Sequence, residues 1–346
     1  MLGSGMLSSG RRGTLSTLAV PCVLATTLAL CTAPVTSGAV RGWDSSTASA
    51  LGEASLAAVS CASTRSCTAV GSSGSGVLVE SWDGRTWSLA PTPAISGGVA
   101  VLNGVSCTSP RSCVAVGDMS SSGGAAYDLR PLVESWDGSH WSVAHSPGLG
   151  LASATLNGVS CASTESCMAV GNDRSTTLAE RWDGAVWSVV ASRAPGSYGG
   201  FSGLFCSSAS SCTAVGNFSY GTGSASSILP RALVESWDGR SWSVPPLPGP
   251  SVAHLYGVAC ALRACQAVGG YTSAAGTTRS LAEFWDGSAW SMVPSPSLPT
   301  AELDGVACAT EEFCVAVGQY SKSLVGPSPS GALIETWDGT AWSVHA

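Results

Sequence analysis

Six copies of one unit of about fifty residues fill nearly all of this 346-residue chain, and the repetition limits its fold more than any other feature. The fullest copy, residues 102–143, contains LNGVSC, a short loop, SCVAVG, a variable insert and PLVESWDGSHWSV. One such unit cannot bury its apolar surface alone, so neighbouring units must pack against one another. The repeat therefore predicts one array of stacked units, where length alone would suggest two or three domains.

Each unit contains four short runs typical of β-strands. In the second unit these are residues 102–107, 113–117 and 132–136, and a fourth run that begins at Trp141. The third run alternates with a period of two, and an Asp-Gly pair marks the turn that follows it. Radial closure covers both faces of such sheets. The predicted fold is an all-β, six-bladed β-propeller with four antiparallel strands per blade. An open β-solenoid or two stacked sandwiches are the alternatives.

The predicted blades span about residues 57–93, 102–147, 156–195, 202–249, 255–296 and 303–346. Residues 1–39 have the features of a signal peptide, because Arg11 and Arg12 precede an apolar run that small residues follow. Two alternatives stay open for this segment, a twin-arginine address and a lipid anchor at Cys31. Residues 40–56 form a leader of small residues. We therefore expect a secreted, extracellular protein.

Composition limits the partners of the chain. Charged residues make up 11% of it and hydrophobic residues 45%, a balance typical of short strands and turns. After removal of the first 39 residues, thirteen basic and twenty-two acidic side chains remain, a net charge of −9. This acidic balance argues against nucleic acid as a partner. No later apolar run is long enough to span a bilayer, and we expect a monomer without a cofactor.

Twelve cysteines follow the signal, two per unit, each pair separated by four or five residues. Across a tight hairpin this spacing brings opposed positions to a distance that a disulfide can bridge, and export favours oxidation. Zinc is disfavoured because there is no CxxC pair and the histidines lack ligand spacing, so no metal site is predicted. The predicted disulfides are Cys61–Cys67, Cys107–Cys113, Cys161–Cys167, Cys206–Cys212, Cys260–Cys265 and Cys308–Cys314.

A second motif joins the third and fourth runs of every unit, as in Ser81, Asp83, Gly84 and Trp87. These residue types resemble the Asp-box, the BNR-type repeat of sialidase-like propellers. The whole unit resembles the repeat of bacterial propellers of the photosystem II assembly-factor kind, over about residues 57–344. The resemblance implies a fold more than a chemistry. The same residues also predict a braced turn, because Asp can accept backbone N–H bonds and Gly allows positive φ.

The recurring tryptophans and glutamates are interpreted as structural. Two tryptophans per unit would fill the spaces between blades, and an aromatic platform for a glycan is the alternative. One glutamate per unit recurs, and six equivalent carboxylates argue for a hydrogen bond to a neighbouring blade more than for catalysis. These glutamates are Glu80, Glu134, Glu180, Glu235, Glu283 and Glu335.

Strand alternation places the cysteine hairpins and the Trp-Asp-Gly turns at one end of every blade, termed the constant end. The connections between second and third strands and between blades lie at the other, variable end, where function concentrates in rigid folds. Two rings of polar side chains are predicted there, suited to a carbohydrate or small polar ligand; solvated loop residues are the alternative. The inner ring comprises Asn103, Asn157, Ser202, Tyr256 and Asp304, and the outer ring Asp118, Asn172, Asn217 and Gln319 with Tyr220, Tyr271 and Tyr320.

The sequence is compatible with three functions. The favoured one is an extracellular, non-enzymatic binding propeller that recognises a glycan, a peptide or a cell-envelope partner through the variable end. A sialidase-like glycoside hydrolase or lyase would need an arginine cluster and a Tyr/Glu pair near the axis, and the only acid predicted beside the channel is Asp304. A calcium-stabilised module would rest on Asp304, Asn103 and Asn157. Four arginines are expected in loops of the variable end: Arg130, Arg174, Arg231 and Arg279.

Overall fold

The computed structural model describes residues 54–345 except 75, 96–97, 121–128, 151–152, 175, 197, 221–228, 297, 299 and 322–329. The described residues belong to one compact unit, Thr47–Ala346. The predicted signal peptide with Cys31, and the leader before Ala54, lie outside the described residues. Within them, no helix has the length and apolar character needed to cross a membrane.

The described strands form six antiparallel sheets of four, and each sheet takes its strands in chain order from one continuous repeat. The first three blades consist of β1 (Ala54–Ser63), β2 (Ser66–Ser73), β3 (Gly76–Trp82), β4 (Trp87–Leu89); β5 (Ala100–Ser109), β6 (Ser112–Ser120), β7 (Leu129–Trp136), β8 (Trp141–Ala144); and β9 (Ala154–Ser163), β10 (Ser166–Asp173), β11 (Thr176–Trp182), β12 (Trp187–Val189). A short 3-10 helix, η2 (Pro147–Gly150), joins the second blade to the third.

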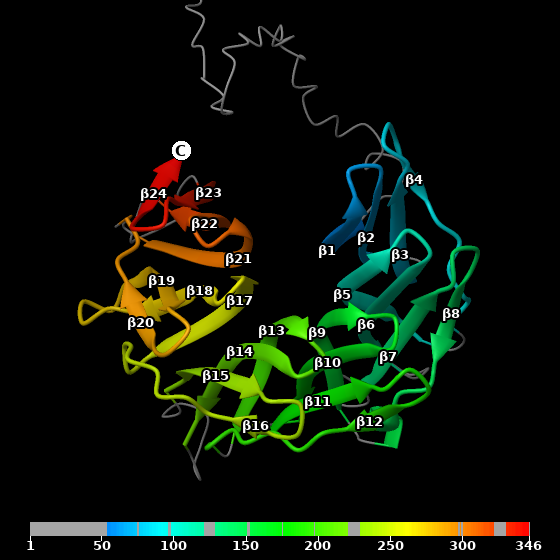
Figure 1. Cartoon of the computed structure of the whole chain (residues 1–346), viewed down its shortest axis with the longest axis horizontal. Helices are drawn as coiled ribbons and strands as arrows, with labels where there is room; N and C mark the ends of the chain where they lie inside the picture. Colours follow the sequence, from blue (N-terminus) through cyan, green and yellow to red (C-terminus); the bar gives the residue numbers. More distant parts are fainter. Residues whose placement is uncertain are drawn as a thin grey trace, which may run out of the picture. The chain divides into compact units, whose positions relative to one another are not determined.

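The last three blades consist of β13 (Tyr198–Ser208), β14 (Ser211–Ser219), β15 (Arg231–Trp237), β16 (Trp242–Ser243); β17 (Ala253–Ala261), β18 (Ala264–Thr272), β19 (Thr278–Trp285), β20 (Trp290–Val293); and β21 (Thr300–Thr310), β22 (Phe313–Ser321), β23 (Ser330–Trp337), β24 (Trp342–His345). The blades follow one another around a common centre with their first strands innermost (Figure 1). The predicted six-bladed β-propeller is confirmed.

Apolar side chains pack between consecutive blades. At the junction of the second and third blades, Val116 and Val133 meet Leu156 and Val159. The side of a blade at the position of Leu156 and Val159 is termed its leading face, and the side at the position of Val116 and Val133 its trailing face. The described residues form five such clusters, one at each junction between consecutive blades. Burial of each large apolar side chain contributes about 1.5–3 kcal/mol, so these junctions dominate the core.

The constant end is held as the sequence predicts. All six predicted disulfides form, with Cα atoms 3.9–4.0 Å apart. In the first turn, the N–H groups of Arg85 and Thr86 donate to Asp83 Oδ1 at 2.7 and 2.8 Å, and Gly84 has a φ of 93°. Similar bonds recur in the other five blades. Hydrogen bonds from N–H and hydroxyl groups lower the pKa of all six aspartates, so the turns favour ionised carboxylates.

The tryptophans tie the two turns of the constant end together. The indole N–H of Trp82 donates to the carbonyl of Thr64 in the disulfide hairpin at 3.2 Å, and four other blades repeat this bond. In every blade the third-strand and fourth-strand tryptophans are neighbours, with ring centroids 5.5–5.8 Å apart. In the second to sixth blades these tryptophans also belong to the clusters between blades, which confirms their predicted packing role there, and the third-strand tryptophan has an added hydrogen-bonding role.

The recurring glutamates differ among blades. Glu180 accepts hydrogen bonds from Ser146 Oγ at 2.8 Å and from the Gly148 N–H at 3.1 Å, both in the connection from the preceding blade. Glu235 and Glu335 are held similarly by serines of the preceding connections. Glu134 and Glu283 are fully buried, and neither has a partner among the described residues. Burial raises their pKa to about 7 and about 8, respectively.

Candidate functional site

The inner ring of predicted site residues stands on β-bulges. In every blade the pairing of the first and second strands slips by one residue at this position, for example between Leu102 and Gly104, and leaves Asn103 as the extra residue. The same slip isolates Asn157, Ser202, Tyr256 and Asp304. A bulge turns a side chain out of the regular alternation of the strand. The predicted inner ring is thus a repeated structural position.

In the second and third blades these bulge residues form hydrogen bonds to the next blade. Asn103 Nδ2 donates to the carbonyl of Leu156 in the next blade at 3.0 Å and to Asp118 Oδ1 at 3.1 Å. Asn157 Nδ2 donates to the carbonyl of Phe201 at 2.7 Å. These amides therefore clamp consecutive blades together. Burial raises the pKa of Asp118, and the Asn103 hydrogen bond opposes that rise.

Only some side chains of the predicted outer ring are free of contacts that would compete with a ligand. Asn172 Oδ1 accepts from Thr155 Oγ1 at 2.8 Å, and half-buried Asn217 pairs with Gly200 across the strands. Tyr320 packs on the core of the sixth blade, whereas exposed Tyr220 lies edge-on to Phe218 with ring centroids 5.4 Å apart. Half-buried Ser202 and exposed Gln319 complete the set. The structure does not gather all twelve predicted residues at one place.

Titratable groups gather instead on the innermost strands of the fifth and sixth blades. The rings of His254 and Tyr256 lie nearly parallel, with centroids 6.0 Å apart. Burial raises the pKa of Tyr256 and lowers that of His254, and the charge of Glu302 raises both. Burial and Glu302 also raise the pKa of Asp304. Glu302, which the sequence analysis does not single out, precedes Asp304 by two residues on the same strand and adds a second acidic side chain near Tyr256.

Gly270 of the fifth blade lies opposite Glu302 of the sixth. The residue at this position in the other blades carries a side chain: Ser72, Asp118, Asn172, Asn217 and Gln319. In the fifth blade a Cβ on Gly270 would lie 3.2 Å from the Cβ of Glu302. Glu302 also accepts a hydrogen bond from Gln319 Nε2 at 2.7 Å. The AVGG sequence of this blade, in place of AVG followed by a larger residue, is the signal that could have located the site.

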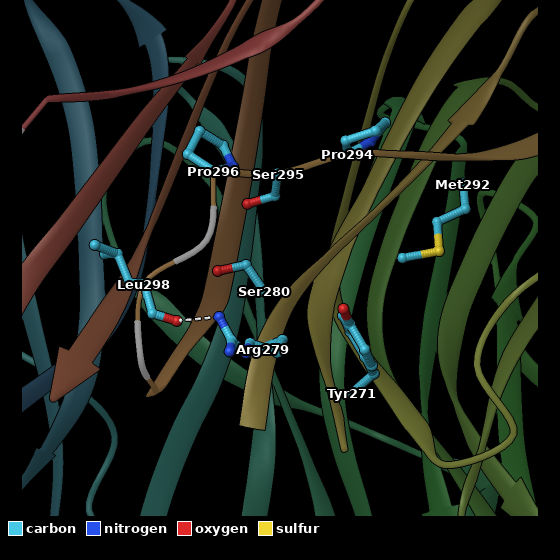
Figure 2. Close-up of a pocket in the computed structure, with 8 residues that line it drawn as sticks. All are labelled: Tyr271, Arg279, Ser280, Met292, Pro294, Ser295, Pro296 and Leu298. Atoms are coloured by element: carbon cyan, nitrogen blue, oxygen red, sulfur yellow. Dashed lines mark hydrogen bonds between the residues drawn. The ribbon is translucent and has the colours of Figure 1, made fainter. Parts of the chain in front are cut away.

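A pocket of about 260 Å³ opens at the same end of the fifth blade (Figure 2). Register connects it to the cluster, because Gly270 pairs with His254 on one side and with Ser280 on the other. Tyr271 and Arg279 are opposed in the next row of the same sheet. The connection that leads to the sixth blade supplies the facing wall. The lining residues are Tyr271, Arg279, Ser280, Met292, Pro294, Ser295, Pro296 and Leu298.

The pocket presents hydrogen-bond donors. Arg279 Nη1 donates to the carbonyl of Leu298 at 2.9 Å, the contact drawn in Figure 2, and no acidic side chain among the described residues pairs with this guanidinium. Ser280 is 8% exposed, and its hydroxyl has no partner among the described residues. A guanidinium can form up to five donor contacts, so Arg279 retains capacity for a ligand. Apolar surface from Met292 and the prolines surrounds these donors.

The arrangement limits the chemistry of this end. Among the described residues, no group of three or more His, Cys, Asp or Glu side chains is placed to hold a metal ion. Arg130, Arg231 and Arg279 each stand near the start of the third strand of a different blade, and Arg174 lies in the corresponding turn of another. Four arginines on four blades form no single carboxylate-binding cluster.

Comparisons with known proteins find similarity at the level of fold. No protein-family model matches the chain, and no curated protein matches it. The solved structure of YCF48 bound to D1 peptide matches with a TM-score of 0.52 and 13% identity, over 84% of this chain and 80% of that one. YCF48 from Cyanidioschyzon merolae matches equally well in TM-score and identity, over 85% of each chain. A chain of the mitotic checkpoint complex matches with a TM-score of 0.52 and 10% identity, over 84% and 79%.

Proposed function

We propose that this protein is a non-enzymatic interaction propeller that captures an extracellular partner at the variable end of its fifth and sixth blades. The observation that carries this proposal is a pocket in which, among the described residues, Arg279 has no acidic partner and the buried Ser280 hydroxyl has no partner. A buried polar group without a partner costs about 1–3 kcal/mol, and a ligand acceptor would remove that cost. Binding sites commonly combine apolar walls with a few convergent polar groups, as this pocket does.

The chemistry of the two neighbouring surfaces favours a polypeptide segment as the ligand. Arg279 and Ser280 offer donors in the pocket, while Glu302, opposite Gly270, and Asp304 on the same strand as Glu302 offer acceptors. A peptide supplies both kinds of group at short, regular intervals along its backbone. The solved YCF48 structure with D1 peptide supports the proposal as an example of peptide binding on a propeller of similar fold. A glycan would instead pair mainly through hydroxyl groups.

An extracellular location is supported by the six disulfides, which fit an oxidising environment. The export signal expected in residues 1–39 agrees with it. The sialidase-like alternative gains no comparable support, because the four arginines stand on separate blades.

Binding of the secreted protein to a peptide array and a glycan array would test the function. We expect Arg279→Ala to weaken peptide binding about ten- to a hundred-fold, the range for loss of a charge-assisted hydrogen bond. Arg85→Ala is the matched control, because Arg85 is exposed at the constant end and should leave binding unchanged. The double variant Tyr256→Ala with Asp304→Ala tests the inner cluster in the same assay.

If Arg279→Ala and Arg85→Ala weaken peptide binding equally, the pocket at Arg279 is not the binding site. Selective binding to glycans would retain the site but overturn the peptide assignment. Hydrolysis of a fluorogenic glycoside panel by the purified protein would overturn the non-enzymatic function. Thermal unfolding of each variant should remain close to wild type, which shows that a loss of binding is not a loss of fold.

A further inference from the structure

Two apolar blade faces are exposed at the ends of the blade series. On the leading face of the first blade, Leu56 is 52% exposed and Val59 is 61% exposed. On the trailing face of the sixth blade, Val317 is 49% exposed and Ile334 is 41% exposed. Trp87 of the first blade is half-buried, although the fourth-strand tryptophan of every other blade is buried. Each face therefore presents a contiguous apolar surface to solvent.

The same positions are covered at every other junction. The counterparts of Leu56 are all 0% exposed: Leu102, Leu156, Phe201, Leu255 and Leu303. The counterparts of Val317 are also 0% exposed: Val70, Val116, Val170, Val215 and Val268. Among the described residues, no apolar cluster joins the sixth blade to the first, and Figure 1 shows an opening between these two sheets. The described residues thus leave one leading face, on the first blade, and one trailing face, on the sixth blade, uncovered.

We propose that the trailing face of the sixth blade binds the leading face of the first blade of a second copy of this chain. Five junctions within the chain already show which surface covers a leading face: the trailing face of the preceding blade. The described part of the chain has one such surface to spare, around Val317 and Ile334. Association through these faces continues an interface that the protein builds five times. It replaces the monomer expected from the sequence with a head-to-tail assembly.

The polar contacts of this junction should make it weaker than the two internal junctions at which an asparagine bonds across to the next blade. Asn103 and Asn157 each donate across a junction to the next blade, at the carbonyls of Leu156 and Phe201. The sixth blade carries Asp304 at that position, and an ionised carboxylate has no proton to donate to Leu56. The intermolecular junction therefore keeps the apolar contact and loses the amide clamp. We expect association that reverses on dilution.

A head-to-tail contact joins two different surfaces, so it leaves one surface of each kind free in every dimer. Such heterologous contacts form a closed ring if the rotation between copies allows closure, and an open filament if it does not. The mass of the wild-type chain should therefore increase with concentration, and the increase need not stop at a dimer.

Sedimentation velocity and light scattering on three single variants test the interface. Val59→Lys places a charge on the leading face and Ile334→Lys places one on the trailing face, so each should hold the chain at the mass of one copy. Val186→Lys is the matched control, because Val186 is 59% exposed in a turn of the constant end and should assemble as wild type does. All three positions are exposed, and thermal unfolding should confirm that the variants fold.

A mixture of the two blocked variants gives the decisive measurement. The Val59→Lys chain keeps an intact trailing face and the Ile334→Lys chain keeps an intact leading face. Mixed in equal amounts, they should form a dimer and nothing larger. A wild-type chain that is monomeric at all concentrations overturns the proposal, whether its two faces close on each other or another segment covers them. Assembly by either variant alone, or no dimer in the mixture, also overturns it.

Discussion

Glu302 of the sixth blade lies over Gly270 of the fifth, with its Cβ 3.2 Å from the point that a Cβ on Gly270 would occupy. The contact joins residues of two blades at the end of the molecule where the repeats differ. It brings a carboxylate beside His254 and Tyr256, and it leaves room for a pocket at Ser280. Among the six blades, only the fifth has glycine at this position, so this part of its surface differs from that of the other blades.

Substitution of Gly270 by Asn, the residue that stands at this position in two other blades, should displace Glu302. We expect a loss of about 1–3 kcal/mol in unfolding free energy from overpacking, together with weaker ligand binding. Urea unfolding and the peptide-binding assay measure the two effects. Gly74→Asn is the control, since nothing lies within 4 Å of a Cβ built there. An unchanged Gly270→Asn protein would show that the contact does not constrain Glu302.

Glu283 should make the stability of the protein decrease with increasing pH. Burial raises the pKa of Glu283 in the folded state to about 8, from its ordinary value of 4.5. Below pH 4.5 both the folded and unfolded states hold the proton, and between pH 4.5 and 8 only the unfolded state releases it, so the contribution is lost as pH rises through this window. Glu283→Gln should therefore be more stable than wild type at pH 8, by about 1–2 kcal/mol after allowance for relaxation, and nearly equal at pH 4.

Unfolding by urea at a series of pH values measures this difference. Glu165→Gln is the control because Glu165 is exposed at a disulfide hairpin. Parallel pH profiles for wild type and Glu283→Gln would show that the buried carboxyl group finds a partner or water in solution.

The braced turns of the constant end should be sensitive at their glycines. Gly239 has a φ of 94°, and a Cβ there would lie 2.8 Å from Ser210 Cβ. Gly239→Ala combines backbone strain with this close contact, so we expect a loss of about 1–3 kcal/mol. Asp238→Asn should cost less, because an amide oxygen can still accept the two N–H bonds that now reach Asp238 Oδ1. Thermal unfolding measures both variants. If Asp238→Asn lowers the melting temperature more than Gly239→Ala does, the hydrogen bonds contribute more to stability than the backbone conformation of the glycine.

Intact-mass measurement after alkylation should find the twelve cysteines of the propeller protected until reduction. Each short loop that a disulfide closes contributes about 2 kcal/mol on the chain-entropy model, so reduction should lower the melting temperature markedly. Alkylation of any pair in the native protein would refute complete oxidation.

The sequence determines the features that depend on residues close together in one repeat. Cys67 follows Cys61 by six positions, and Thr86, whose N–H donates to Asp83, follows that aspartate by three, so spacing alone predicts both contacts. Repetition in six units then predicts the number of blades, because one four-stranded sheet cannot cover its own faces. These predictions depend only on residues within one repeat and on the number of repeats, and the structure confirms them.

Tertiary structure decides what lies across a junction. Nothing in the local pattern shows that Asn157 bonds to the carbonyl of Phe201, 44 residues away. The same holds for the glutamates: Glu180 meets a serine from the preceding connection, whereas Glu283 has no described partner. Register within a sheet follows from turns of a few residues, but contact between blades depends on how two whole sheets pack. For that reason the architecture could be predicted from the chain, while the site at Gly270 and the unpaired faces at Val59 and Ile334 emerge only from the folded molecule.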